Sequence, residues 1–194
     1  MREKPKTQLG AALLLFLVFI GCASTKSNVV FRDPKMDFGA IQSVAVMPFT
    51  NLTRDTLAGE RVRDVFMTML QATGGVYVLP PGEVGRGIAR LNLERPASPT
   101  PEEVTKFAKI VNADALITGT VSEYGEVRSG SSTANVVSIS VQMMEAQTGR
   151  VVWSAASTKG GITMTDRLFG GGGEPMNATT QKAVDDLLEK LFGK

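Results

Sequence analysis

Residues 137–155 read VSISVQMMEAQTGRVVWSA, and this stretch decides the fold class. Every second residue from Val137 to Met143 is apolar, and on the alternate face only Met144 is apolar. A period of two is typical of a strand with one buried face. Thr148-Gly149 then predicts a turn into the apolar run 151–155, so the stretch is expected to form an antiparallel hairpin.

The rest of the chain supplies helices and further strands around this hairpin. Helix 58–70 is indicated by apolar residues at spacings of three and four, and Thr100-Pro101-Glu102-Glu103 predicts a capping box. The order β-α-β-α-α-β-β-β-α predicts an α/β sandwich, with helices packed on a mixed sheet. The expected elements are a strand-like piece at 29–31 that pairs with a later segment, strands at 43–49, 76–79 and 115–121, the hairpin at 136–155, and helices at 58–70, 82–93 (broken by Gly85 and Gly87), 101–111 and from Pro175 onward.

Cys22 closes a short apolar stretch near the start and is the only cysteine in 194 residues. A basic start, an apolar run over 9–20 and a small residue before Cys22 are typical of a secretory signal peptide. The run is too short to cross a bilayer, which takes about 20 residues. We expect a signal peptide at 1–21, a lipidated N-terminus and tether at 22–40 and a periplasmic α/β domain at 41–194.

Phe19-Ile20-Gly21-Cys22 resembles the lipobox of bacterial lipoproteins, which implies that Cys22 carries acyl chains such as palmitate. The alternative is an ordinary signal sequence with an incidental cysteine. Stable anchoring takes more than one chain, and lipoproteins of this type carry several. Ala23, rather than aspartate, follows the cysteine, which favours the outer membrane with the domain facing the periplasm. A tether of about sixteen residues would reach about 50 Å from the membrane.

Charge and composition exclude several classes of function. The chain has 21 basic and 19 acidic residues, and removing the leader leaves a formally neutral domain. Such a domain lacks the basic footprint of a nucleic-acid-binding protein. There is no histidine, which excludes a histidine-based triad or metal site, and we expect no cofactor and no metal.

The remaining motifs have a structural and a functional interpretation. Glu60 and Asp64, and Glu102 and Glu103, are expected to be helix surface charges, with a carboxylate-dependent hydrolase as the alternative. The glycines at 82–87 and 170–173 fit neither GxGxxG nor the P-loop and are expected to be linkers. The residues expected to have structural roles are Asp114, bracing the loop before its strand, and Trp153, Tyr124, Met143 and Met144, packing in the core rather than anchoring an interface.

Three segments resemble the curli-secretion (CsgG-like) lipoprotein family, whose relatives include the outer-membrane activator lipoproteins of penicillin-binding proteins. They are SVAVMPFTNLT at 43–53, NADALITGTVSEY at 112–124 and QTGRVVWS at 147–154. The resemblance implies the periplasmic core of that fold. The segment 125–135, GEVRSGSSTAN, is short and polar where the curli exporter inserts transmembrane hairpins, so we expect those hairpins to be absent.

These observations favour a non-enzymatic, lipid-anchored periplasmic protein of the outer membrane. It would act by protein–protein interaction in envelope assembly, secretion or peptidoglycan synthesis, with an envelope protein partner and possible homo-oligomers. The membrane contact would come from the acyl chains on Cys22. The alternative is an oligomeric secretion channel subunit of the curli-exporter type.

Overall fold

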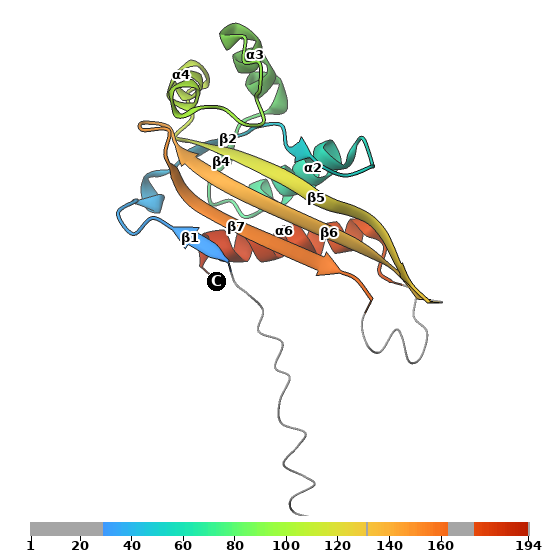
Figure 1. The fold of residues 1–194 in the computed structure, drawn as a ribbon. Coiled ribbons are helices and arrows are strands. Elements are labelled where there is room, and N and C mark those ends of the chain that lie inside the picture. Colours follow the sequence, from blue (N-terminus) through green and yellow to red (C-terminus); the bar gives the residue numbers. More distant parts are fainter. Residues whose placement is uncertain (1–28, 131, 163–172, 194) are drawn as a thin grey trace, which may run out of the picture.

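The computed structural model describes residues 29–130, 132–162 and 173–193 of the 194-residue chain. They form a seven-stranded mixed sheet in the order β1-β7-β6-β5-β2-β4, with β3 paired to β5 (Figure 1). None of the helices in these ranges is long and apolar enough to cross a membrane. The elements are β1 (Val30–Arg32), the 3-10 turn η2 (Phe38–Ala40), β2 (Ser43–Val46), β3 (Thr50–Asn51), α2 (Ala58–Ala72), β4 (Tyr77–Val78), α3 (Pro81–Leu91), α4 (Pro101–Val111), β5 (Ala115–Ser129), β6 (Ser132–Glu145), β7 (Val151–Gly160) and α6 (Met176–Phe192).

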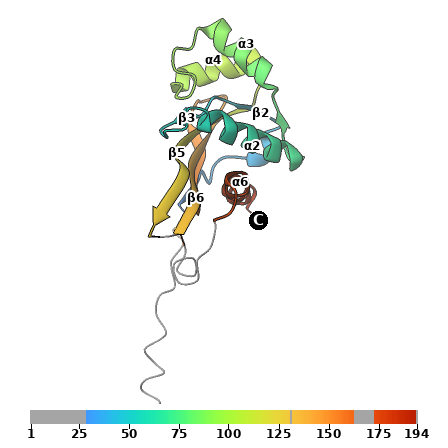
Figure 2. The same cartoon turned by 90° about the vertical axis from the view of Figure 1, so that its right-hand side faces the viewer.

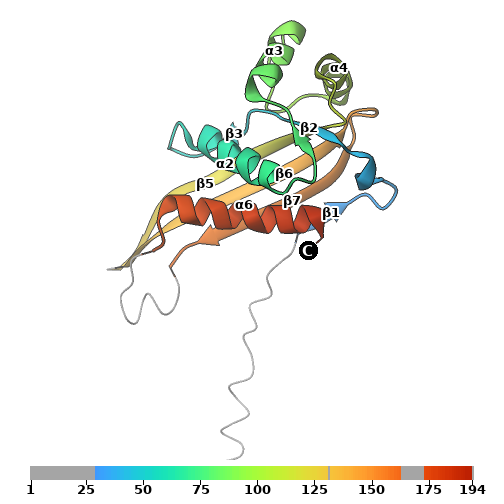
Figure 3. The same ribbon diagram turned by 180° about the vertical axis from the view of Figure 1, so that it is seen from behind.

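The sheet separates two apolar cores, which confirms the predicted α/β class. Helices α2 and α6 cover one face, and α3 and α4 cover one end of the other face (Figure 2). Seen from behind, α6 runs along the sheet beneath α2 (Figure 3). Side chains alternate between the two faces of β6, so Met143 packs in the core under α2 and α6 and Met144 packs in the core under α3 and α4.

The predicted hairpin is formed by β6 and β7, with Val141 opposite Ala155. Gly149 adopts φ 68° in its turn, where an added Cβ would lie 2.2 Å from the carbonyl oxygen of Pro101. A non-glycine residue would be strained here by both its conformation and the lack of space. This position therefore joins the β6–β7 turn closely to the start of α4.

The long hairpin formed by β5 and β6 differs from the prediction. The polar segment after Tyr124 is strand in its described part, because β5 continues to Ser129 and β6 begins at Ser132. The two strands pair along their whole length, and a register shift lies between Val121 and Glu123. Residues 122–129 lack the apolar alternation by which strands are recognised, and backbone pairing with β6 supplies the order instead.

Helix α3 is continuous, so the prediction of a broken helix was wrong. Gly87 lies where α3 crosses α4, and a Cβ there would be 2.6 Å from Val111 Cγ1 and 2.8 Å from Phe107 Cε2. The glycine therefore permits close packing rather than ending the helix. Gly85 is exposed, and a Cβ added there would have nothing within 4 Å.

The N-terminal strand is fastened to the domain at two points. β1 pairs antiparallel with β7, as predicted for 29–31, with Val30 opposite Ala155. Arg32 Nη1 donates a 2.8 Å hydrogen bond to the carbonyl oxygen of Leu191 in the last turn of α6, and its guanidinium lies 3.9 Å from the centre of the Phe38 ring. Both ends of the described chain therefore meet at one edge of the sheet.

Candidate interaction surface

A rigid loop between β3 and α2 presents two exposed leucines. Leu52 is 67% exposed and Leu57 is 47% exposed. The amide of Leu52 donates to the carbonyl oxygen of Val121 at 2.9 Å, which fixes the start of the loop against β5. We call residues 52–57 the leucine loop.

Polar side chains within the leucine loop and at its start hold its shape. Asn51 Oδ1 accepts hydrogen bonds from the amide and hydroxyl of Thr53, at 3.0 and 2.8 Å, and its Nδ2 donates to the carbonyl oxygen of Asp55 at 2.7 Å. Asp55 accepts from the Leu57 amide at 2.9 Å and pairs with Arg61 at 2.8 Å. A preorganised loop loses little conformational entropy when a partner covers its apolar side chains.

The outer edge of β5 continues from this loop. β2 and β3 pair with β5 only as far as Val121, and within the described ranges no strand pairs with this edge over residues 122–129. The edge carries Glu123, Glu126 and Arg128, and the last two form an exposed pair at 3.9 Å. Charges and a bulge protect a free edge against indiscriminate strand pairing. The edge remains available to a partner that complements these charges.

The face of the sheet away from α2 and α6 is polar beyond α3 and α4. Figure 1 views the sheet from this face. Ser138 Oγ and Thr158 Oγ1 lie 2.9 Å apart on it. A polar pocket of about 220 Å³ lies farther along the same face, and it is lined by Thr50, Ser98, Thr118, Thr120, Ser140 and Gln142.

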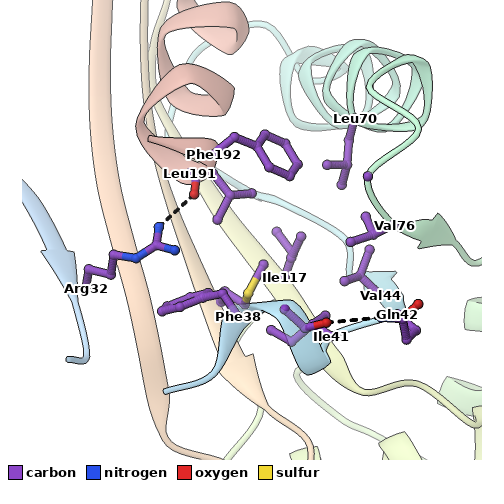
Figure 4. Close-up of a pocket in the computed structure, with 13 residues that line it drawn as sticks. Arg32, Phe38, Ile41, Gln42, Val44, Leu70, Val76, Ile117, Leu191 and Phe192 are labelled. Atoms are coloured by element: carbon purple, nitrogen blue, oxygen red, sulfur yellow. Dashed lines mark hydrogen bonds between the residues drawn. The ribbon is translucent and has the colours of Figure 1, made fainter. Parts of the chain in front are cut away.

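An apolar pocket of about 330 Å³ lies between η2 and the end of α6 (Figure 4). Its floor is formed by the buried side chains of Val44, Leu70 and Ile117. Phe38 and Phe192 stand at its sides, and Arg32 lies at its rim with its hydrogen bond to Leu191.

Asp114 braces the start of β2, which extends the predicted structural role. Its Oδ2 accepts from the amides of Gln42 and Ser43, both at 2.9 Å, and from the Ser43 hydroxyl at 3.0 Å. Partial burial raises the pKa of Asp114, but these three hydrogen bonds outweigh it and the net pKa is lowered. The carboxylate therefore joins the starts of the two parallel strands β2 and β5.

The carboxylates considered for catalysis lie on helix surfaces. Glu60 and Asp64 are exposed on α2, on either side of Arg63. Arg63 donates two hydrogen bonds to the carbonyl oxygen of Val46, from Nε at 3.2 Å and from Nη2 at 2.7 Å. Burial lowers the pKa of Arg63, and the negative charges of Asp64 and Glu60 partly offset this effect. Within the described ranges, no three acidic or cysteine side chains gather as a metal site would require.

Glu103 has the predicted capping role at the start of α4. Its carboxylate accepts from the Thr100 amide at 2.7 Å, while the Thr100 hydroxyl accepts from the Glu103 amide at 3.3 Å. Glu102 is exposed in the first turn of the same helix. Both acidic side chains lie where the helix dipole favours negative charge.

The glycines at 82–87 belong to α3 rather than to a phosphate loop or a linker, so the linker prediction for them was wrong. Of the glycines at 170–173, only Gly173 lies within the described residues. A Cβ at Gly173 would be 2.6 Å from the Cα of Ala134, so this glycine packs closely against β6.

The aromatic and methionine side chains have the predicted core roles. Trp153 is 1% exposed in the core beneath α2 and α6, and its Nε1 has no hydrogen-bond partner among the described residues. Tyr124 is partly buried against the same core, and Met143 and Met144 are buried. Trp153 is therefore not an interface anchor.

Cys22, the predicted lipid attachment site, lies outside the described residues. Lipid attachment there stays a prediction.

The leucine loop was not predicted as an interaction surface, because the sequence indicates only turn and capping residues there. A leucine inside the polar sequence NLTRD is the available signal, but its exposure depends on the tertiary position of the loop.

A family model described as "Putative lipoprotein GNA1162-like" matches residues 37–187. None of the curated proteins matches the sequence.

Three solved structures are similar to this chain at low sequence identity, and two of them have TM-scores above 0.5. GNA1162 from Neisseria meningitidis has a TM-score of 0.57 and 17% identity, covering 79% of this chain and 99% of that chain. A PelC dodecamer from Paraburkholderia phytofirmans has a TM-score of 0.55 and 18% identity, covering 84% and 94%. The C-terminal domain of LpoB from Salmonella enterica has a TM-score of 0.48 and 18% identity, covering 65% and 86%. At these identities the likeness to GNA1162 and PelC concerns the fold alone.

Proposed function

Because this chain belongs to the GNA1162-like lipoprotein family, we propose that it is a non-enzymatic envelope protein, anchored through acylated Cys22, that binds other proteins. The leucine loop carries this proposal, because it holds two exposed apolar side chains in a fixed geometry beside an unpaired strand edge. Aliphatic anchors in a rigid frame suit a protein partner, whose binding energy concentrates in a few buried side chains.

The family assignment supports the lipoprotein part of the resemblance drawn from the sequence. The match over residues 37–187 supports the GNA1162-like family, and the curli-secretion assignment is not supported. The secretion-channel alternative, which rested on that assignment, is also not supported.

Location and assembly belong to the same proposal. We place the domain on the periplasmic face of the outer membrane, on the basis of the lipobox-like sequence and Ala23. The PelC structure is a dodecamer, and we extend to this chain the expectation that copies associate. The free edge of β5 offers backbone groups for such an association.

A photo-crosslinking residue at Leu52 tests partner binding in cells. We expect a discrete crosslinked band, and the double variant Leu52→Asp, Leu57→Asp should weaken recovery of the same partner at least tenfold. Tyr77→Asp is the matched control, because Tyr77 is 59% exposed on β4, away from the loop. Equal recovery from the loop variant and the control would reject the leucine loop as the binding surface.

The anchor is tested separately by mass spectrometry of the N-terminal peptide. We expect diacylglyceryl and acyl groups on Cys22 and no residues before it. A retained leader or an unmodified thiol would reject the lipid-anchored part of the proposal.

A further inference from the structure

Three consecutive apolar side chains are exposed where the described chain begins. Val29 is 66% exposed, Val30 38% and Phe31 47%. Val30 and Phe31 belong to β1, the last strand at its end of the sheet. Figures 1 and 3 show this strand beside the end of α6. We call residues 29–31 the apolar edge.

Charges balance over residues 32–37, which directly follow the apolar edge. Arg32 and Lys35 are countered there by Asp33 and Asp37, and Arg32 is already engaged with Leu191 and Phe38. Asp33 Oδ1 accepts from the Lys35 amide at 2.9 Å. The edge itself is three uncharged apolar residues, so the contact that it offers is apolar.

The chain before the apolar edge limits what it can reach. Seven residue steps separate Cys22 from Val29, and a fully extended chain of that length spans at most about 25 Å. This limit is about half the reach expected for a sixteen-residue tether, because β1 is fastened to β7. With Cys22 acylated, as proposed above, the edge stays within that distance of the lipid surface. Such confinement raises the effective concentration of the edge at the membrane to the millimolar range, so weak apolar contacts are sufficient.

We propose that the apolar edge docks on the lipid surface, with Val29, Val30 and Phe31 in the interfacial layer. Interfacial binding scales with the apolar area buried, and Phe31 contributes a large apolar side chain of a type that interfacial helices bury in that layer. The leucine loop then lies on the far side of β5. Four strand spacings separate β1 from β3, so the loop is held about 19 Å farther across the sheet.

The test uses the full-length, acylated protein in phosphatidylcholine vesicles. Phe31→Cys and Val29→Cys each introduce one free thiol for a nitroxide label, because the natural cysteine carries the lipid. Tyr77→Cys is the matched exposed control. Collision rates with oxygen, which concentrates in lipid, are compared with those of a water-soluble nickel chelate.

We expect the ratio of oxygen to nickel accessibility to be several-fold higher at positions 29 and 31 than at position 77. Replacing Phe31 with serine should raise nickel accessibility at position 29, and Tyr77→Ser should leave it unchanged. Phe31 is half exposed, so these changes leave the core intact, and circular dichroism verifies the fold.

Equal ratios at positions 31 and 77 in acylated protein that floats with the vesicles would overturn this inference alone. Shielding of position 31 from both probes that grows with protein density would also overturn it, because a second copy would then cover the edge. Mass spectrometry showing unmodified Cys22 would overturn both this inference and the proposed anchor.

Discussion

Replacing Asp186 with asparagine should remove a pH-dependent part of the stability of the fold. Asp186 lies on α6, where its carboxylate accepts from Lys159 of β7 at 2.7 Å and from Lys190 at 2.6 Å. The three side chains are 12–27% exposed, so solvent screens them only partly. Lys159 lies on β7 and the other two residues lie on α6, so the cluster joins the helix to the strand.

The size of the expected loss of stability follows from the pKa of Asp186. Burial alone raises the pKa of Asp186, but hydrogen bonds from Lys159 and Lys190 outweigh it and lower the pKa from 3.8 to about 2. At roughly 1.4 kcal/mol per pKa unit, the ionised form stabilises the fold by about 2 kcal/mol. Because the folded pKa lies below the unfolded one, this stabilisation is complete above pH 3.8 and is lost as the pH falls through 2.

Urea unfolding of the purified protein between pH 7 and pH 2 provides the measurement. Asp186→Asn should lower the free energy of unfolding by about 2 kcal/mol at pH 7, and the difference from the native sequence should shrink toward pH 2. Asp185→Asn is the control, since Asp185 is exposed on the same turn. A pH-independent difference, or equal effects of the two variants, would refute the reasoning.

Three further predictions concern the fold, and each is measured by urea unfolding. Gly87→Ala should lower the free energy of unfolding by about 1–3 kcal/mol, because its Cβ would lie 2.8 Å from the buried Phe107 ring and overpack the core. Gly85→Ala should raise the free energy of unfolding by up to about 1 kcal/mol, because alanine favours the helix and has free space there. Effects of the same sign would contradict the packing argument. Thr100→Ala should cost about 1 kcal/mol through loss of the capping box, and an unchanged urea midpoint would count against that contribution. Asp114→Ala should cost about 1–2 kcal/mol, since three hydrogen bonds are lost at a partly exposed site, and a neutral result would argue against the brace.

Local patterns in the sequence predicted much of the fold. The period of two over 137–143 specified the β6 face, and Thr-Gly specified the turn into β7. The capping box predicted the start of α4, and the helix expected from Pro175 onward is α6 (Met176–Phe192). In each case the sequence pattern and the structure that it predicts involve residues close together in the chain.

Features that depend on distant contacts were not predictable. Gly87 resembles a helix breaker until Phe107 and Val111 of α4 are placed against it. The outer half of β5 is polar and gains its order from β6. The exposure of Leu52 and Leu57 likewise depends on where the leucine loop meets β5, so the candidate surface required the structure.

The hydrogen bond from Arg32 to Leu191 spans 159 residues of sequence. A chain that emerges from its N-terminus cannot complete this bond until its final helix has been made. β1 also pairs with β7, which ends at Gly160, so strand pairing does not have to wait for this hydrogen bond. Among the described residues, the first strand is therefore fastened at both of its points only when the last strand and the last helix are in place.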